Sequence, residues 1–319
     1  APQVLDLRAG AMRPGWSRLV LELDAPSLVG TAEMKTGDAG ALVRVRLRPA
    51  DQAAFAERAA EPDPETWRLP RSADTRAARS RQRGQGPLLV VLDPGHGGID
   101  PGAQSGNVNE ADLMLRFARE LKEVLTRTGE MQVVLTREAD VFVPLESRIA
   151  VAHAVEADVF LSLHADALTE GQATGATVYT MSEAASDAAS AALAERHDRD
   201  ALLSGVDLTG QDDLIAGVLM ELARVETAPR AERMADALVA ALRGQQVRLH
   251  KVPKRGAAFS VLKSPDIPSV LLEIGYLSPN GDLARLTDPA WRARVAAAVA
   301  EGLAQWRVAD AAEAALLRQ

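Results

Sequence analysis

Residues 88–98, Leu-Leu-Val-Val-Leu-Asp-Pro-Gly-His-Gly-Gly, constrain the fold of this chain more than any other segment. Their apolar first half, with two valines at its centre, is typical of a strand that is buried on both faces. The strand has to end near Pro94, because proline has no N–H to donate and the following glycines favour turns. His96 is therefore expected on a tight loop at the carboxyl end of a buried strand, the edge at which open α/β sheets bind ligands.

Beyond Pro87, predicted strands alternate with predicted helices. Further strands are expected at residues 131–136, 158–164, 175–181, 258–263 and 269–273, and helices at 111–128, 145–155, 182–242 with a break at 205–210, and 291–306. The first helix shows the clearest periodicity, since apolar residues recur every four positions from Leu113 to Leu125. This alternation predicts an α/β fold with a mainly parallel, twisted sheet flanked by helices.

The chain is expected to have further parts on either side of this domain. Residues 1–56 predict a small β module with strands at 4–7, 17–23 and 42–47, separated by turns rich in Gly and Pro. Residues 57–86 contain many charges and few apolar residues, which predicts a disordered linker. The α/β domain is expected at 87–307, and residues 308–319 are expected to extend its last helix or to fray.

Composition argues against several classes of protein. A net charge of −8 and a pI near 5.3 argue against nucleic acid as the main partner. No apolar run approaches the ~20 residues that a membrane-spanning helix needs. The chain has no cysteine, so disulfides and thiolate metal ligands are absent. A signal peptide is not visible either, and Ala1-Pro2-Gln3 would suit the start of a mature, secreted chain.

Three predicted strands deliver polar side chains to one edge of the sheet. His96 follows the first strand, His164 ends another, and Glu273 ends the last. Glu110 lies in the first turn of the helix after His96, and this turn faces the same edge. Two imidazoles and one carboxylate are a ligand set that catalytic zinc prefers, with the fourth tetrahedral position left for water. The residues therefore predict a zinc site.

Three segments of the chain closely resemble the zinc-dependent N-acetylmuramoyl-L-alanine amidases of bacterial cell division. They are residues 91–98 (Val-Leu-Asp-Pro-Gly-His-Gly-Gly), 160–166 (Phe-Leu-Ser-Leu-His-Ala-Asp) and 268–273 (Pro-Ser-Val-Leu-Leu-Glu). The resemblance covers roughly residues 87–307, and its motifs are specific rather than generic. It implies that His96, Glu110 and His164 are the zinc ligands and that Glu273 is the catalytic carboxylate.

The resemblance also implies a substrate and a location. The expected reaction is hydrolysis of the amide between N-acetylmuramic acid and the L-alanine of the peptidoglycan stem peptide, in daughter-cell separation. The expected location is the periplasm, and the chain is expected to be a monomer. The β module at 1–56 resembles the latter half of an AMIN domain, a peptidoglycan-binding module, and the chain was expected to begin inside that domain.

About 75 residues separate the strand at 175–181 from residue 258, far more than a crossover between strands requires. The simplest interpretation is a set of extra helices packed on the sheet. In the division amidases, however, the corresponding region is an autoinhibitory element that places a glutamate on the zinc until a LytM-type activator displaces it. Here His197 stands where that glutamate is common, with Glu195 two residues before. Residues 183–222 are therefore predicted to gate the site, with one of these two side chains blocking it.

Other residues and other functions stay open at this point. His153 and His250 are expected to be structural, while Arg137 and Arg148 either bind substrate carboxylates or form ion pairs. One alternative function is another zinc peptidoglycan peptidase or carboxypeptidase, acting within the stem peptide. The other is a non-catalytic wall-binding protein, which would need no metal position open to substrate.

Overall fold

The computed structural model divides the chain into two compact units, residues 1–71 and 72–319. It describes residues 4–13, 16–37, 40–59, 86–167, 174–182, 184–202, 214–277 and 282–316. The described residues of the first unit form two antiparallel hairpins and one helix. These are β1 (Val4–Arg13) with β2 (Trp16–Leu23), β3 (Ser27–Gly37) with β4 (Gly40–Pro49), and α1 (Gln52–Ala59).

The first unit differs from its prediction in two places. Strand β3 was not expected, because Gly30 interrupts an already weak alternation of apolar and polar residues. Helix α1 crosses the predicted boundary at residue 56, since its alanine-rich sequence favours helix and the Asp51 side chain accepts a hydrogen bond from Ala54 N. Most of the predicted linker, residues 60–85, lies outside the described residues.

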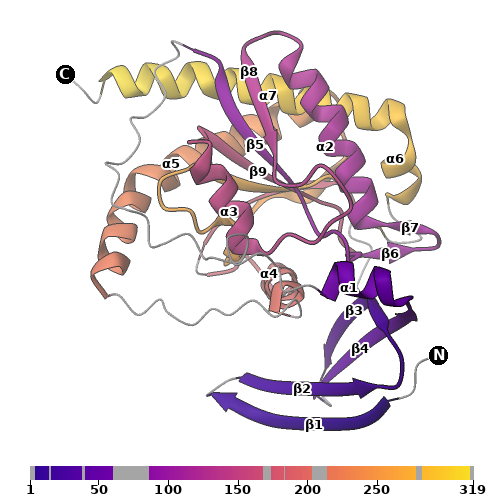
Figure 1. Cartoon of the computed structure of the whole chain (residues 1–319). Coiled ribbons are helices and arrows are strands. Elements are labelled where there is room, and N and C mark those ends of the chain that lie inside the picture. Colours follow the sequence, from indigo (N-terminus) through magenta and orange to yellow (C-terminus); the bar gives the residue numbers. More distant parts are fainter. Residues whose placement is uncertain are drawn as a thin grey trace. The chain divides into compact units, whose positions relative to one another are not determined.

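The second unit is built on a six-stranded sheet with the order β11-β10-β12-β9-β5-β8 (Figure 1). The strands are β5 (Leu88–Pro94), β8 (Met131–Leu135), β9 (Val159–His164), β10 (Ala176–Met181), β11 (Leu249–Ala257) and β12 (Ser269–Glu273). All neighbouring strands are parallel except β10 and β12, which are antiparallel. The prediction of a mainly parallel sheet is thus confirmed.

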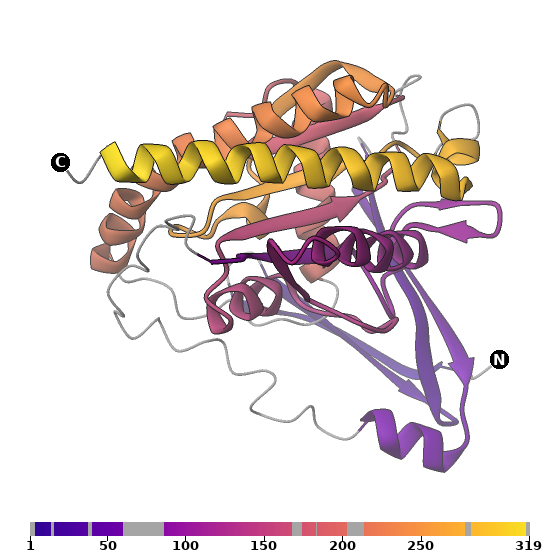
Figure 2. The ribbon, with the colours of Figure 1, turned by 90° about the horizontal axis from the view of Figure 1, so that it is seen from above.

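The two faces of the sheet carry different helices (Figure 2). Val90 and Leu92 point to the face covered by α2 (Glu110–Thr126), α5 (Leu214–Gly244) and α7 (Pro289–Leu316). Val91 points to the opposite face, which packs with α3 (Leu145–Ala154), α4 (Ala188–Leu202) and the 3₁₀ helix η1 (Ser260–Leu262). Successive residues of one strand thereby fill two separate apolar cores.

Two predictions about the second half of the chain need correction or refinement. The strand expected at 258–263 is wrong, because these residues lead into and form η1, while the edge strand β11 lies just before them. A short apolar run does not by itself distinguish a buried strand from a buried turn of helix. The predicted helical region 182–242 comprises α4 and α5, and its predicted break at 205–210 lies outside the described residues.

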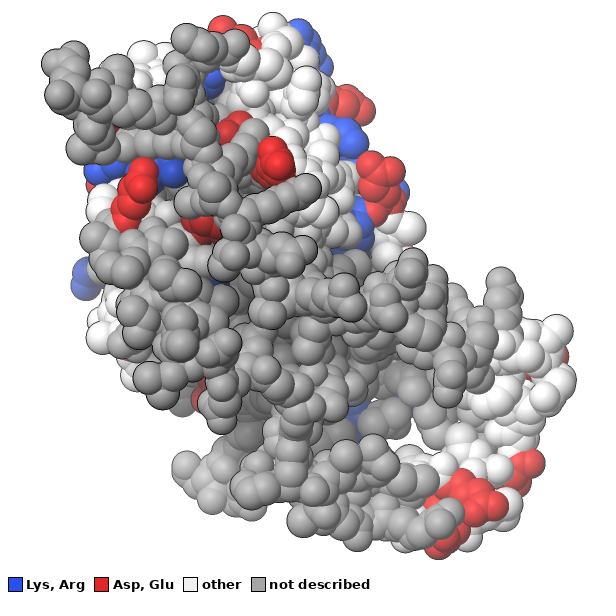
Figure 3. Space-filling model, turned by 60° about the vertical axis from the view of Figure 1, so that its left-hand side comes forward, with Lys and Arg blue, Asp and Glu red and all other residues white. Residues whose placement is uncertain are grey.

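The remaining elements are short. A hairpin of two short strands, β6 (Gln104–Ser105) and β7 (Val108–Asn109), precedes α2. Helix α6 (Leu283–Thr287) precedes α7. Helix α7 runs without a break into the predicted tail. Among the described helices, none has the length and apolar character that crossing a membrane requires. Where the face in Figure 3 is described, Lys and Arg side chains lie among Asp and Glu side chains.

Candidate metal centre

The site lies where strands β5, β9 and β12 end together. Glu273 and His164, the last residues of β12 and β9, are direct partners in the parallel ladder. On the other side of β9, Pro94 pairs with Leu163, and Gly95 N donates to Leu163 O at 3.0 Å. The sheet therefore brings the loop of His96 alongside His164 and Glu273, as the sequence predicts.

A buried aspartate at the end of β5 organises the loop that follows. Asp93 accepts hydrogen bonds from Thr136 Oγ1 at 2.6 Å, Ser162 Oγ at 2.7 Å and Arg148 Nη1 at 2.7 Å. Burial opposes its ionisation, but the charge of Arg148 and the three hydrogen bonds hold the pKa of Asp93 below its ordinary value. Asp93 was not singled out in the sequence, although a carboxylate directly after a buried apolar run needs such partners.

Arg148 and Arg137 bind the backbone of the same loop. Arg148 pairs with Asp93 and also donates to the carbonyl oxygens of Pro94 and His96, at 2.9 and 2.8 Å. Arg137 donates to the carbonyl oxygens of Pro94 and Gly95, at 2.9 and 2.8 Å. Both arginines are buried. Of the two roles considered for Arg148, the ion pair is the one observed.

His96 is held in an uncommon backbone conformation. Its φ is +58°, in the left-handed region that non-glycine residues rarely occupy. Its Nδ1 lies 2.7 Å from Asp100 Oδ2, and its Nε2 lies 3.3 Å from Glu110 Oε2. Burial favours the neutral imidazole, but the charges of Asp100 and Glu110 raise the pKa of His96 well above its ordinary value.

Glu110 lies between the two histidines at the start of α2, which Asn109 caps through a hydrogen bond from Asp112 N. Its Oε1 is 3.0 Å from His164 Nδ1 and accepts from Ala165 N at 2.9 Å. The carboxyl group is completely buried, which opposes ionisation. The neighbouring imidazoles nevertheless hold the pKa of Glu110 well below its ordinary value, so the group is an anion at neutral pH.

These three side chains fit a zinc ion. Glu110 Oε1 lies 3.0 Å from His164 Nδ1, and Glu110 Oε2 lies 3.3 Å from His96 Nε2. Ligand atoms at 2.0–2.2 Å from a tetrahedral zinc would lie roughly 3.3 Å from one another. His96 Nε2 is buried and makes no hydrogen bond to any described residue, as expected of a nitrogen whose partner is a metal. Two imidazoles and an ionised carboxylate thus offer zinc suitable donor atoms at suitable spacing.

Glu273 lies next to His164 in the sheet but is not one of the three proposed zinc ligands. Its Oε2 accepts from Asp166 N at 3.1 Å, while its buried Oε1 has no hydrogen-bond partner among the described residues. Burial and the charges of Glu110 and Asp166 raise the pKa of Glu273 well above its ordinary value. A carboxyl group with these properties is suited to carrying a proton during catalysis.

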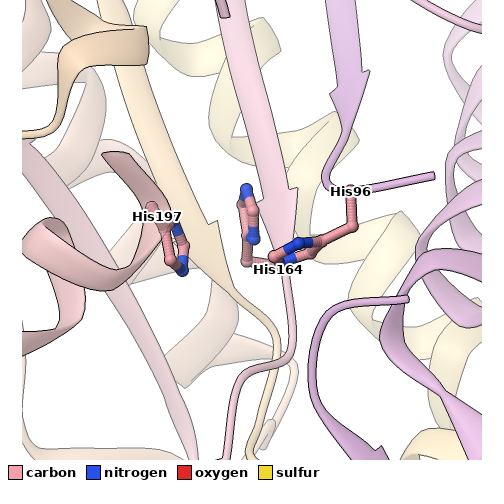
Figure 4. A group of neighbouring side chains, drawn as sticks. All are labelled: His96, His164 and His197. Carbon is pink, nitrogen blue, oxygen red and sulfur yellow. The ribbon is translucent and has the colours of Figure 1, made fainter. Parts of the chain in front are cut away.

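A third imidazole reaches the site from α4. His197 points toward His164 and His96 in Figure 4, and its ring centroid is 4.1 Å from that of His164 and 5.7 Å from that of His96. Nitrogen atoms of the three rings lie within 4.8 Å of one another, so these imidazoles can also hold a metal ion. His197 Nε2 is 4.0 Å from Glu273 Oε1. Of the two candidates on α4, His197 is buried at the site, and Glu195 is exposed.

Two glycines allow the ligands to approach the backbone. A Cβ atom on Gly95 would lie 2.2 Å from Cε1 of His164. A Cβ atom on Gly102, whose φ is +63°, would lie 2.6 Å from Cδ2 of His96 and 2.8 Å from Glu110 Oε2. Any larger residue at either position must displace a candidate ligand.

The remaining histidines have other contacts. His153 Nδ1 lies 3.6 Å from Asp266 Oδ2, a contact between α3 and the segment that follows η1. His250 Nδ1 accepts from Val252 N at 3.0 Å, within the edge strand β11. Both contacts agree with the structural roles expected for these two residues.

Comparison with known proteins gives matches over the same part of the chain. Residues 90–305 match the model of a protein family described as N-acetylmuramoyl-L-alanine amidase. The chain is 37% identical over 220 residues to the N-acetylmuramoyl-L-alanine amidase AmiA of Escherichia coli (strain K12), an alignment that covers 68% of this chain and 75% of AmiA. It is 34% identical over 219 residues to AmiC of Escherichia coli O6:H1, covering 68% of this chain and 52% of AmiC. The chain therefore spans about half the length of AmiC.

Solved structures agree with the fold. An N-acetylmuramoyl-L-alanine amidase from Clostridium difficile 630 superposes with a TM-score of 0.50 at 22% identity, covering 69% of this chain and 97% of that one. The CwlD amidase from Clostridioides difficile, solved in complex with the GerS lipoprotein, gives a TM-score of 0.51 at 20% identity, covering 70% and 99%. At these low sequence identities, the two superpositions show that the fold is shared and nothing more. His96, Glu110, His164 and Glu273 all lie within the range of the family match, residues 90–305.

Proposed function

Since this chain belongs to the N-acetylmuramoyl-L-alanine amidase family, we propose that it hydrolyses the amide between N-acetylmuramic acid and the L-alanine of the peptidoglycan stem peptide. One observation carries the proposal. Glu110 lies 3.0 Å from His164 and 3.3 Å from His96, and Glu273 is the partner of His164 in the neighbouring strand. A wall-binding protein has no need of such a set.

Zinc is the proposed cofactor, held by His96 Nε2, His164 Nδ1 and the carboxylate of Glu110. When bound, it supplies a positive charge that polarises the scissile carbonyl and lowers the pKa of the attacking water. The ionised state of Glu110 and the buried, unpaired Nε2 of His96 support this assignment. Arg148 pairs with Asp93 and donates a hydrogen bond to the carbonyl oxygen of His96. These contacts hold the loop of His96 in place before the substrate binds.

Glu273 is the proposed general base and general acid. Its Oε1 accepts the proton of the attacking water and later returns it to the nitrogen of the departing L-alanine. The backbone N–H of Asp166 holds the other carboxyl oxygen, so that the proton is carried on Oε1. The raised pKa of Glu273 favours this role, because the carboxyl group keeps the proton long enough to deliver it.

The test uses purified sacculi and the Glu273→Gln variant. The wild-type chain with zinc should release intact stem peptides whose amino terminus is L-alanine, while Glu273→Gln should bind zinc and lose nearly all turnover. Glu123→Gln, on the exposed side of α2, is the matched control and should keep full activity. Cleavage within the stem peptide would instead identify a peptidase or carboxypeptidase. A zinc content near zero would support the wall-binding alternative.

Helix α4 is the proposed gate. His197 brings a ring nitrogen within 4.8 Å of nitrogens of His96 and His164 and lies 4.0 Å from the proposed catalytic carboxyl group, which supports a closed resting state. A LytM-type activator is the proposed partner that displaces the helix. Glu195 is a weaker candidate for the blocking residue because it is exposed on α4. Deleting residues 183–222 should raise activity without an activator; unchanged activity in a folded variant would count against the gate.

The proposed setting is the periplasm, where the enzyme separates daughter cells as a monomer. The family match begins at residue 90 and does not cover residues 1–56. The assignment of these residues to part of an AMIN domain is therefore a proposal as well. Binding to the wall is tested by sedimenting the inactive Glu273→Gln chain with sacculi, with and without residues 1–71. Equal sedimentation of both forms would argue against a binding role for the N-terminal unit.

A further inference from the structure

Asp100 contacts His96 at Nδ1, the ring nitrogen other than the one that faces Glu110. Its Oδ2 lies 2.7 Å from Nδ1 of His96, and its Oδ1 accepts a hydrogen bond from Gly102 N at 3.0 Å. Its backbone is paired with Gly97 in both directions, N to O at 2.8 Å and 3.1 Å. Both carboxyl oxygens and the main chain of Asp100 are therefore engaged, and the orientation of the carboxylate is set.

The contact determines which nitrogen of His96 carries the proton. A carboxylate accepts hydrogen bonds, so Nδ1 of His96 has to donate to Asp100 Oδ2. In the neutral ring the other nitrogen, Nε2, then carries a lone pair. This is the atom that lies 3.3 Å from Glu110 Oε2 and has no hydrogen-bond partner among the described residues.

The backbone of His96 makes such a contact necessary. With φ at +58°, the residue occupies a conformation that is unfavourable for any side chain with a Cβ atom. Arg148 binds the carbonyl oxygen of His96, which fixes the backbone of the residue rather than its ring. Asp100 is the described residue that hydrogen-bonds the ring. Without it, the ring would be free to rotate or to exchange its protonated nitrogen.

We propose that Asp100 is a positioning residue for His96, holding its ring in the orientation and tautomer that present Nε2 to a metal. The proposal rests on the zinc site described under the proposed function. Carboxylates that bind the far nitrogen of a ligating histidine also make that histidine a stronger ligand. Asp100 therefore contributes to metal affinity without itself being a ligand.

The chain offers a matched control. Asp140 accepts a hydrogen bond from Gly98 N at 2.7 Å, so it holds the same loop through the backbone. This hydrogen bond goes to the loop backbone, one step removed from the ring of His96. Asp140→Ala removes a carboxylate from the loop, whereas Asp100→Ala removes the carboxylate that orients the imidazole. Asp100→Asn is the conservative variant, since its amide oxygen still accepts from Nδ1–H.

The first measurement is zinc affinity, by competition with a chromophoric chelator. Asp100→Ala should weaken zinc binding by roughly 10- to 100-fold, the range found for partners of ligating histidines. Asp100→Asn should recover much of the affinity, and Asp140→Ala should match the wild type. Circular dichroism and thermal unfolding establish that each variant is folded. Wild-type affinity in folded Asp100→Ala would overturn the proposal.

The second measurement needs no metal. Nitrogen-15 shifts of the imidazoles in the metal-free protein, recorded at a pH high enough for the ring of His96 to be neutral, report its tautomer, which should be the Nδ1–H form in the wild type and a mixture in Asp100→Ala. An unchanged tautomer in the variant would overturn the proposal. If the wild type bound no zinc, the proposed function would fail, and the tautomer comparison would still decide the role of Asp100.

Discussion

The imidazole of His197 lies against that of His164, with ring centroids 4.1 Å apart and ring planes inclined by 30°. The two residues come from different layers, since His164 ends the central strand β9 and His197 lies on α4. His197 Nε2 is also 3.9 Å from Asp166 Oδ2. One side chain of α4 thus approaches both the proposed ligands and the proposed proton carrier.

Replacing His197 with alanine should raise amidase activity in the absence of an activator, by several-fold or more, while zinc content stays at the wild-type level. The reason is that the variant removes the imidazole that lies against His164 and leaves the three proposed ligands in place. Hydrolysis of dye-labelled sacculi and metal analysis provide the measurements. Glu195→Ala tests the weaker candidate on the same helix, and the exposed change Glu123→Gln on α2 is the control. Lower activity with full zinc would mean that His197 assists catalysis.

The attachment of α4 gives a second prediction. Asp187 accepts from Ser190 N at 2.8 Å, which caps the helix, and its Oδ2 lies 3.1 Å from Nη1 of the buried Arg255 on β11. Asp187→Ala removes both contacts, and loss of a cap alone costs about 0.5–2 kcal/mol. Amide hydrogen exchange should accelerate in residues 188–202, and basal activity should rise. Faster exchange without higher activity would separate the stability of α4 from gating.

Gly95→Ala should abolish zinc binding in a folded protein. The added methyl group would lie 2.2 Å from Cε1 of His164, so the ring has to move out of the ligand set. Gly244→Ala, where nothing lies within 4 Å of the added atom, is the matched control. Zinc content after dialysis and the thermal unfolding midpoint are the measurements. Retention of stoichiometric zinc in Gly95→Ala would contradict the assignment of His164.

The buried pair of Asp93 and Arg148 predicts how stability depends on pH. Asp93→Asn should lower the free energy of unfolding at pH 7 by about 3–5 kcal/mol, because it leaves the charge of Arg148 buried without a partner. The pKa of Asp93 is lower in the folded chain than in the unfolded chain, where it is about 3.9. Its stabilising contribution is therefore complete well above that value and is lost as the pH falls through the folded pKa.

The measurement is urea unfolding of the wild type and Asp93→Asn between pH 7 and pH 3. The difference in free energy between them should be constant near neutrality and should shrink below about pH 4. Asp140→Asn, which removes an exposed carboxylate that binds the loop after β5 from the segment after β8, should show little difference at any pH. A difference that grew toward acid pH would mean that Asp93 is not ionised in the folded protein.

The sheet and the proposed ligands were predictable from the sequence for one physical reason. Strands buried on both faces are continuous apolar runs, and β5, β9 and β12 are such runs that end in polar side chains. Because parallel strands end at one edge, the meeting of His164 and Glu273 followed from the order of elements alone. Glu110 followed from the position of the next helix.

The supporting residues could not be found in this way. Asp100 acts from a loop whose course has no periodicity, and its spacing from His96 gives no sign that their side chains meet. Arg148 binds Asp93 across 55 residues of sequence. The sequence around an arginine does not show whether its side chain is buried or solvated. His197 could be singled out only by resemblance to a family, because nothing in an alanine-rich helix indicates which side chain enters a site.

The pairing of Glu273 with His164 has a consequence for how this protein loses activity. Sliding β12 by one residue along β9 would turn Glu273 to the opposite face of the sheet, so the separation of the two groups depends on the register of two completely buried strands. Such strands open only when the whole domain unfolds. On warming, therefore, this pair should keep its geometry until the domain melts, and inactivation that sets in at lower temperature will have begun elsewhere, in the loops or in α4.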